Sequence, residues 1–278
     1  LKAKIEGHGK PLKKWAIEIN YGIKTGYNDA FVIDEATKDK LIAKNPKSEE
    51  LIKPFLAGRN IKRYHPPKAE KWLILVPKGF TIKKNLAKDN PNRIEEPPPR
   101  YGEMPFDEAW SWFKSNYPAI ASHLSFYREK AEKRQDMGDF WWEQRSCAYY
   151  EDFKKPKIIW GELSNKAKFT YDDEDHYLNN TTFMMVGYNL KYLLAVLNSK
   201  VAQWYFETIS TTSGMGTNRW LKYKIELLPV KEPHQNQERE IESLVKEILA
   251  TKKQDPDADT SDLEAEIDQL VYQLYGLT

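Results

Sequence analysis

Short apolar runs alternate with polar, lysine-rich segments along the first third of the chain. The runs predict strands over residues 15–19, 30–34 and 72–76, because β-branched and aromatic side chains fill each run and turn-forming residues flank it. Residues 48–56 instead predict a helix, and Ala57-Gly58-Arg59-Asn60 predicts its end. An exposed basic turn is expected there, carrying Arg59, Lys62 and Arg63.

Helical spacing of apolar residues marks the middle of the chain. From about residue 106 to 134 the aromatic and aliphatic positions recur at intervals of three and four, which predicts a mainly helical insertion with one buried face. Strands are predicted over 157–160 and 181–186, and a single helix over 190–208. That helix ends at a loop rich in Gly, Ser and Thr.

Two amphipathic segments close the chain after a short predicted strand over 225–230. Asp255-Pro256-Asp257 separates them, Ser261 and Glu264 have the spacing of a capping box, and Gly276 is a fitting helix stop. Residues 231–278 therefore predict an antiparallel helical hairpin. The whole pattern indicates an α+β fold with a mixed β-sheet, in which residues 1–230 form the body.

Charge divides the chain at the same place. The formal net charge of the 278 residues is +2, but residues 231–278 hold 5 Lys and Arg against 12 Asp and Glu, a balance of −7 that leaves +9 on residues 1–230. A basic body suits a polyanionic partner, although a weak colloidal charge with no partner is the alternative. Aromatic residues make up 13% of the chain, and pairs such as Arg219-Trp220 could stack on bases or form part of a core.

Motifs for self-contained catalysis are missing from the sequence. It has no phosphate-binding loop of the Walker type, no dinucleotide fingerprint after a strand, no C-x-x-C and no H-E-x-x-H. The five histidines lack ligand spacing, so a zinc site is not expected. The acidic run 172–175 could hold a divalent ion, but a solvated turn between strands is the favoured interpretation. Cys147 is expected to be buried and inert.

The same features indicate a cytoplasmic protein without a membrane anchor. A single cysteine cannot form an internal disulfide, and no run of about 18 apolar residues or secretory signal is present. Leu1 in place of a methionine suggests a segment of a longer polypeptide.

Four ordered stretches resemble the TaqI-like C-terminal specificity domain. They are GIKTGYNDAFVID at 22–34, LIKPFLAGRNIKRY at 51–64, FWWEQRSCAYYEDFKKPKIIWGEL at 140–163 and LLAVLNSKVAQWYF at 193–206. The segment YPAIASHL at 117–124 belongs to the same series. Members of this family are target-recognition parts of type IIG restriction-modification enzymes, and similar regions end the adenine-specific methyltransferases of BREX-type phage defence. IELLPV at 225–230 is also similar to the end of a recognition domain in type I specificity subunits.

The resemblance implies recognition of a short double-stranded DNA sequence. An N-terminal methyltransferase domain of the same protein would use S-adenosylmethionine to methylate one adenine, and members with an endonuclease would also need Mg²⁺. The N-P-P-Y-type motif that grips the adenine is absent from this chain. The segment itself is therefore expected to be no enzyme and to hold no cofactor, and residues 1–230 with the insertion at about 106–134 become the DNA target-recognition domain.

Candidate DNA contacts are polar side chains that loops can carry into a groove. The first group is the Gly-rich loop with Ser213, Thr217, Asn218 and Arg219, the second is the turn with Lys24, Thr25 and Asn28, and the third is the basic turn with Arg59, Lys62 and Arg63. The third group is expected to contact phosphates. For each group an ordinary surface loop or hairpin turn is the alternative.

Two other groups of residues are expected to serve the fold. The cations at 128, 130, 133 and 134 alternate with Glu129 and Glu132, which favours a salt-bridged helix over a basic stripe. Trp141 and Trp142 are expected to pack in a core.

Two other functional classes remain open at this point. The hairpin 231–278 could make the chain a protein-interaction or scaffold module that docks on a partner subunit. A stand-alone nuclease or hydrolase would have only the acidic run 172–175 in its favour.

Overall fold

The computed structural model describes residues 1–89, 104–210 and 217–277. The chain divides into two compact units. Unit 1 comprises Leu1–Gly22, Leu56–Lys68 and Glu151–Thr278, and unit 2 comprises Ile23–Phe55 and Ala69–Tyr150. Both units combine helices with antiparallel strands, which confirms the α+β class expected from the sequence.

A four-stranded antiparallel sheet forms the centre of unit 1. Its order is β2 (Ile17–Tyr21), β9 (Thr182–Gly187), β6 (Lys157–Gly161) and β7 (Phe169–Asp172). The strands expected at 15–19, 157–160 and 181–186 are therefore confirmed within two residues. The central strands β6 and β9 are almost continuously buried, which explains their unbroken apolar sequences.

Helices α8 (Leu190–Asn198) and α9 (Lys200–Ile209) follow the sheet, and α8 packs on β6 and β7. The sequence predicts one continuous helix over 190–208, and this is wrong at Ser199. Ser199 has extended backbone angles and its hydroxyl accepts a hydrogen bond from the Ala202 backbone N–H, so it caps a second helix. The break turns α9 relative to α8 while both keep buried apolar faces.

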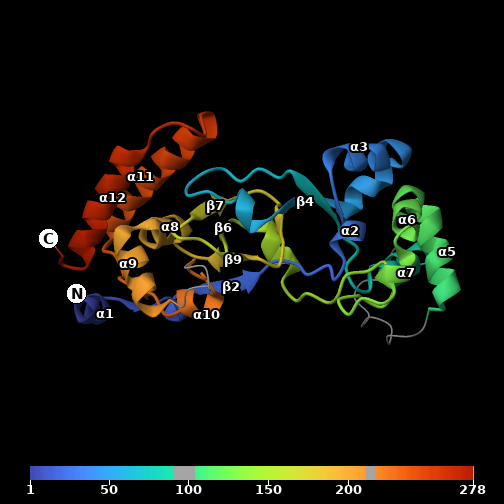
Figure 1. Cartoon of the computed structure of the whole chain (residues 1–278), viewed down its shortest axis with the longest axis horizontal. Helices are drawn as coiled ribbons and strands as arrows, with labels where there is room; N and C mark the ends of the chain where they lie inside the picture. Colours follow the sequence, from blue (N-terminus) through green and yellow to red (C-terminus); the bar gives the residue numbers. More distant parts are fainter. Residues whose placement is uncertain (90–103, 211–216, 278) are drawn as a thin grey trace. The chain divides into compact units, whose positions relative to one another are not determined.

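The predicted C-terminal hairpin is confirmed as α11 (Gln235–Gln254) and α12 (Ser261–Leu274) (Figure 1). α11 packs on α8, and residues of both hairpin helices share one buried cluster with the sheet. They include Ile241, Val245, Ile248, Ile267, Val271 and Leu274. Gly276 follows two residues after the end of α12, and its φ of +60° lies in the left-handed region, as expected for a helix stop.

The capping box expected at Ser261 and Glu264 is wrong, because the helix begins one residue after its N-cap Thr260, whose side chain makes no capping hydrogen bond to the backbone. The Thr260 hydroxyl donates instead to the Glu264 carboxylate. The boundary between a recognition domain and a hairpin at residue 230 stays a prediction.

Smaller elements complete unit 1. They are α1 (Lys2–His8), β1 (Lys10–Pro11), η1 (Leu12–Lys14), η3 (Gly58–Asn60), η4 (Tyr150–Lys154), β8 (Tyr177–Leu178), α10 (Lys222–Ile225) and β10 (Pro229–Val230). β1 and β10 pair in a two-stranded antiparallel sheet. The strand expected over 225–230 is correct only for its last two residues, because α10 extends to Ile225 and a turn follows.

Unit 2 contains the antiparallel strands β3 (Val32–Ile33), β5 (Lys71–Ile74) and β4 (Ile52–Leu56). The helix expected over 48–56 is wrong for residues 52–56, since only η2 (Pro46–Leu51) is helical and β4 follows it. Pro54 opposes a helix there because it has no backbone N–H to donate. The strand expected over 30–34 is also shorter, because α2 (Asn28–Phe31) contains its first two residues.

Besides α2 and η2, the described part of unit 2 contains five more helices. They are α3 (Glu35–Lys44), α4 (Phe80–Asp89), α5 (Phe106–Asn116), α6 (Pro118–Ser125) and α7 (Arg128–Ala131). The last three confirm the helical insertion over 106–134 and show that it is broken at Tyr117 and again before Arg128. Trp141 and Trp142 are buried against Trp110, which confirms their predicted packing role.

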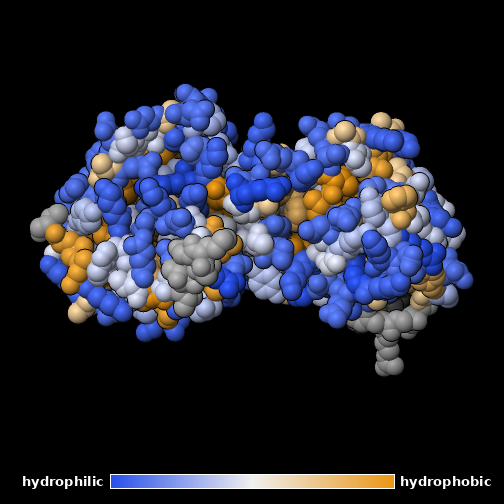
Figure 2. Space-filling model, viewed as in Figure 1, coloured by the Kyte–Doolittle hydropathy of each residue, from blue (hydrophilic) through white to orange (hydrophobic). Residues whose placement is uncertain are grey.

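The surface of unit 1 is mostly hydrophilic where α11 and α12 are joined, at the upper left of Figure 2. Among the described residues, no helix combines the length and the apolar character that crossing a membrane requires.

Candidate nucleic-acid interface

Two chain segments of unit 1 and Thr181 line a hollow of about 360 Å³, which we call the Gly58–Gly161 groove, and a third segment stands at its edge. The first segment is η3 with Ile61, and the second is the turn that follows β6. Side chains along the groove include Arg59, Glu162, Leu163, Ser164, Lys168 and Thr181. The third segment, residues 217–220, adds Arg219 at the edge through its pairing with Leu163.

Two glycines allow the first two segments to cross. A Cβ atom on Gly161 would stand 3.0 Å from the Gly58 Cα and 3.1 Å from the Gly58 carbonyl oxygen. A Cβ on Gly58 would in turn stand 3.1 Å from the Gly161 Cα. Because the obstructing atoms are backbone, they cannot rotate away, so glycine at both positions brings Arg59 beside the end of β6.

The third segment is fixed to the second by backbone hydrogen bonds. The Trp220 N–H donates to the Glu162 carbonyl at 2.7 Å, and the Ser164 N–H donates to the Asn218 carbonyl at 3.2 Å. The Trp220 side chain is buried, stacks on Phe206 with 3.9 Å between ring centroids, and donates its indole N–H to the Ser164 carbonyl. Trp220 thus anchors the segment whose neighbouring residue, Arg219, is exposed.

Glu162 holds the side chain of Arg219. The Nε of Arg219 donates to Glu162 Oε1 at 2.9 Å, and its Nη2 donates to the same oxygen. This hydrogen-bonded carboxylate raises the pKa of the Arg219 guanidinium. The Arg219 side chain is still 48% exposed, whereas that of Glu162 is 20% exposed. The carboxylate therefore orients the guanidinium without covering it.

Cations exceed carboxylates around the groove. Arg59 and Lys168 are exposed along its lining, and Arg219 stands at its edge. Among the described lining residues Glu162 is the one carboxylate, and Arg219 pairs with it. A surface of this composition can attract phosphate oxygens and offer guanidinium donors to base edges.

The structure brings together members of two sequence-predicted groups. Arg59 lines the groove, and Arg219 stands at its edge with Asn218 and Thr217 next to it in the chain. Lys62 is exposed just beyond η3. Ser213, the remaining member of the Gly-rich loop group, lies outside the described residues.

Arg63 is committed to the hairpin of unit 1. Its guanidinium donates to the Glu264 carboxylate on α12 and to the Asn198 carbonyl at the end of α8. The guanidinium also lies over the Tyr64 ring, 5.2 Å from the centroid. This placement gives Arg63 a structural role in joining the basic turn to α12.

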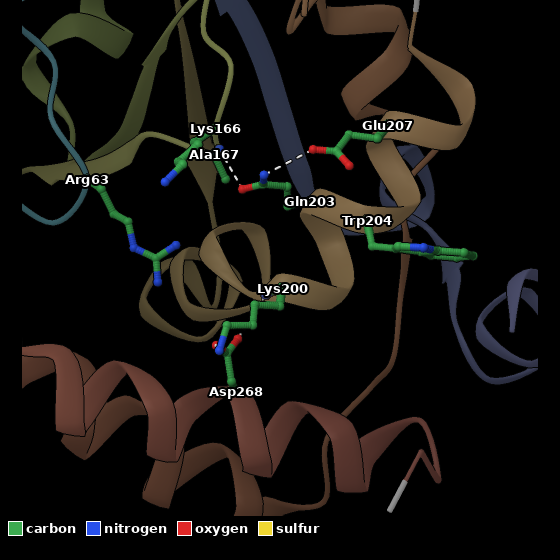
Figure 3. Close-up of a pocket in the computed structure, with 8 residues that line it drawn as sticks. All are labelled: Arg63, Lys166, Ala167, Lys200, Gln203, Trp204, Glu207 and Asp268. Atoms are coloured by element: carbon green, nitrogen blue, oxygen red, sulfur yellow. Dashed lines mark hydrogen bonds and ion pairs between the residues drawn. The ribbon is translucent and has the colours of Figure 1, made fainter.

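A second hollow, of about 530 Å³, surrounds this joint (Figure 3). Four of its polar side chains are bonded within it: Lys200 pairs with Asp268, while Gln203 accepts from the Ala167 N–H and donates to Glu207. Asp268 also accepts the backbone N–H of Lys200 at the start of α9. The hollow is therefore a polar junction between α9 and α12.

The second predicted group lies in unit 2. Lys24 is exposed, but Thr25 is 2% exposed and its hydroxyl donates to the Asn28 side chain at 2.6 Å. The Tyr27 N–H donates to the same hydroxyl. Thr25 and Asn28 thus stabilise the turn before α2, and Lys24 and Asn28 are the exposed members of this group.

The acidic run 172–175 begins at the last residue of β7 and continues into the turn after it, so the predicted solvated turn is confirmed for residues 173–175 and is wrong for Asp172. Asp172 is buried, and its carboxylate contacts the Lys157 ammonium at 3.0 Å and the His176 ring at 2.9 Å. Asp173, Glu174 and Asp175 are exposed. Within residues 1–89, 104–210 and 217–277, no group of three acidic, His or Cys side chains is arranged to hold a metal ion.

The predicted salt bridges of the helical insertion are confirmed. Arg128 pairs with Glu132 and Lys133 pairs with Glu129, each one helical turn apart. Arg134 is instead buried, with 7% of its surface exposed, and donates to backbone carbonyls.

Glu162, Leu163 and Lys168 were not singled out from the sequence. Their only signal is the polar stretch that begins after the predicted strand 157–160, since such stretches mark exposed turns. The contacts that give them significance join residues more than 50 positions apart, such as Glu162 and Arg219.

Comparison with known proteins agrees with these observations. Two solved structures share the fold: the type IIL restriction-modification enzyme MmeI in complex with DNA, at 15% sequence identity and a TM-score of 0.61, and the type IIG restriction endonuclease BpuSI, at 13% and 0.51. Each comparison covers 97% of this chain, but only 34% of the MmeI chain and 31% of the BpuSI chain. This chain thus spans about a third of the length of those enzymes.

A family model matches residues 53–230, which include β6, β9, α8, α9 and every described residue of the Gly58–Gly161 groove. The model describes the TaqI-like C-terminal specificity domain. By this match the chain belongs to the family of TaqI-like C-terminal specificity domains.

Proposed function

We propose that this chain selects a short double-stranded DNA sequence and that the Gly58–Gly161 groove is part of the surface that reads it. Its family supplies the class of function, which is target specificity in restriction-modification enzymes. The observation that carries the proposal is Arg219, held by Glu162 at the edge of a groove that also exposes Arg59 and Lys168.

The chemistry of these side chains divides the work between phosphates and bases. Exposed lysine and arginine neutralise phosphates without reading sequence, and this role suits Arg59, Lys168 and Lys62. An oriented guanidinium can donate two hydrogen bonds to guanine, and this role suits Arg219. Lys24 in unit 2 is a further phosphate contact in this proposal.

The longer protein would provide the catalysis. By family resemblance, an N-terminal domain would bind S-adenosylmethionine and methylate one adenine in the selected sequence, and an endonuclease, where one is joined, would use Mg²⁺. The MmeI and BpuSI chains are about three times as long as this one, which leaves room for such domains. In this proposal the chain contributes specificity and no catalytic group.

Selection from a randomised duplex DNA pool by the purified chain tests the proposal. The wild type should enrich one motif, and Arg219→Ala should relax it at one base pair, by about 1–3 kcal/mol of discrimination. Arg59→Ala should keep the motif while lowering the slope of log K against log salt by about one. Arg239→Ala is the matched control, because it removes an exposed positive charge from α11 and leaves the groove intact.

Two results would contradict the proposal. One is a chain that binds no duplex at about 50 mM salt, where phosphate contacts are strongest. The other is a chain that binds duplex DNA but enriches no sequence. If Arg239→Ala relaxed the motif as much as Arg219→Ala, the groove would not be the reading surface.

A further inference from the structure

Leu163 stands in the groove with 61% of its surface exposed. A single exposed leucine is ordinary on a protein surface, so exposure alone assigns it no role. Its position is more informative, because Leu163 is paired directly with Arg219 in an antiparallel bridge. Opposite residues in such a pair point to the same face, with Cβ atoms about 5 Å apart.

The backbone under this pair is held on both sides. The Glu162 N–H donates to the Thr181 backbone carbonyl at 2.9 Å. The Ser164 N–H donates to the backbone carbonyl of Asn218, and the Trp220 N–H donates to the backbone carbonyl of Glu162. Leu163 therefore sits on a turn whose neighbours are fixed by the sheet and by the buried Trp220. A side chain held in this way reaches the same point relative to Arg219 each time a ligand binds.

Arg219 keeps suitable donors for guanine. A guanidinium has five N–H groups, and Glu162 accepts from Nε and from Nη2. The remaining hydrogens on Nη1 and Nη2 form the outer edge of the guanidinium. That edge can donate to O6 and N7 of guanine together.

The thymine C5-methyl is the apolar group that the DNA major groove presents, and aliphatic side chains recognise it by contact. Successive bases along a strand are about 3.4 Å apart, so two side chains about 5 Å apart can reach adjacent base pairs. We propose that Leu163 and Arg219 read two adjacent base pairs, Arg219 a guanine and Leu163 a thymine through its methyl group. This inference rests on the DNA-binding function proposed above.

Uracil substitution in the selected duplex tests the pair. Replacing thymines one at a time with uracil removes only the methyl group, and at the base pair next to the Arg219-dependent guanine this should weaken wild-type binding about fourfold, as expected for burying one methyl-sized group. Leu163→Ala should abolish the difference between thymine and uracil at that position and at no other. Leu163→Met should keep most of it, since it keeps apolar contact.

The matched control is Leu227→Ala, because Leu227 is also an exposed leucine of unit 1, at 42%, and does not line the groove. It should leave the uracil profile unchanged, and thermal unfolding by circular dichroism should show that all variants are folded. A selected motif in which no thymine depends on Leu163 would overturn this inference while the proposed function stands. Equal weakening of every sequence by Leu163→Ala would overturn it too, by indicating a nonspecific apolar contact. Failure to select any motif would instead contradict the proposed function itself.

Discussion

Two arginines that look alike in the sequence have opposite roles in the structure. Arg219 of unit 1 is exposed, and among the described residues its side chain bonds to a single carboxylate, that of Glu162. Arg134 of unit 2 is buried and donates to the carbonyls of Thr25, Asp136, Trp141 and Glu143. Burial lowers the pKa of Arg134 to about 10, whereas Glu162 raises that of Arg219. The comparison shows what distinguishes a structural arginine from one that can bind a ligand. The structural arginine donates its N–H groups to buried backbone carbonyls, whereas the other keeps N–H groups exposed to solvent.

The surroundings of Arg134 extend this contrast. Glu143 is fully buried, and its carboxylate accepts the backbone N–H groups of Gly79, Thr81 and Asp139. Gln144 bonds to the backbone of Ile74 and Val76 at the end of β5. Glu143 and Gln144 of the stretch FWWEQR therefore provide hydrogen-bond partners for backbone groups of unit 2 that regular secondary structure leaves unpaired.

Arg134→Ala is expected to have the largest effect. It leaves buried carbonyls without donors, and each such group costs about 1–3 kcal/mol, so unit 2 should lose at least about 3 kcal/mol of unfolding free energy. Arg219→Ala should change stability by less than about 1 kcal/mol, because its ion pair is exposed. Urea unfolding followed by circular dichroism measures both. Similar losses of unfolding free energy for the two variants would contradict the structural role of Arg134 and the ligand-binding role of Arg219.

Gly161→Ala should have an intermediate effect. The new Cβ would press on the Gly58 backbone at 3.0 Å, which costs about 1–3 kcal/mol and displaces Arg59 from the groove. Gly7→Ala is the control, because nothing lies within 4 Å of a Cβ there and alanine stabilises a helix by about 0.5–1 kcal/mol. Thermal unfolding and duplex binding should both worsen for Gly161→Ala alone. If Gly161→Ala lowered the stability but left the affinity for duplex DNA normal, the close approach of Gly58 and Gly161 would not be required for DNA binding.

The smallest expected effect is a pH dependence of unit 2. Burial lowers the pKa of His123 below its ordinary 6.5, although its Nε2 is hydrogen-bonded to the Ala30 carbonyl. The folded state therefore favours neutral imidazole, and the stabilisation is complete above about pH 6.5 and is lost as the pH falls through the lowered pKa. His123→Gln should reduce the difference in urea midpoint between about pH 7.5 and pH 5. If the difference in urea midpoint were unchanged in His123→Gln, the pH dependence would arise from other titratable groups.

The sequence was sufficient for elements whose signal is local. The hairpin, the helical insertion and three of the four strands of the unit 1 sheet follow from local apolar patterns, and Gly276 from its place after the last periodic residue. The fourth strand, β7 (Phe169–Asp172), was not predicted. The errors also have local causes. Ser199 interrupts a pattern that is apolar on both sides of it, and Pro54 opposes the helix expected over residues 48–56.

The candidate site depends on contacts between distant segments. Arg59 and Arg63 belong to one basic turn in the sequence, yet Arg59 lines the groove and Arg63 bonds to Glu264, about 200 positions away. Nothing within the turn distinguishes them. Likewise, Gly58 and Gly161 become a matched pair only when two loops cross.

The shared core of the hairpin matters for exchanging specificity modules between enzymes. A chimera cut after Val230 would remove Ile241, Val245 and Val271 from a cluster that also contains residues of β6 and α8. It would also leave the Arg63 guanidinium without its carboxylate partner. A transplanted module therefore has to include residues 231–278, so the acidic C-terminal hairpin and the basic groove have to be transferred together.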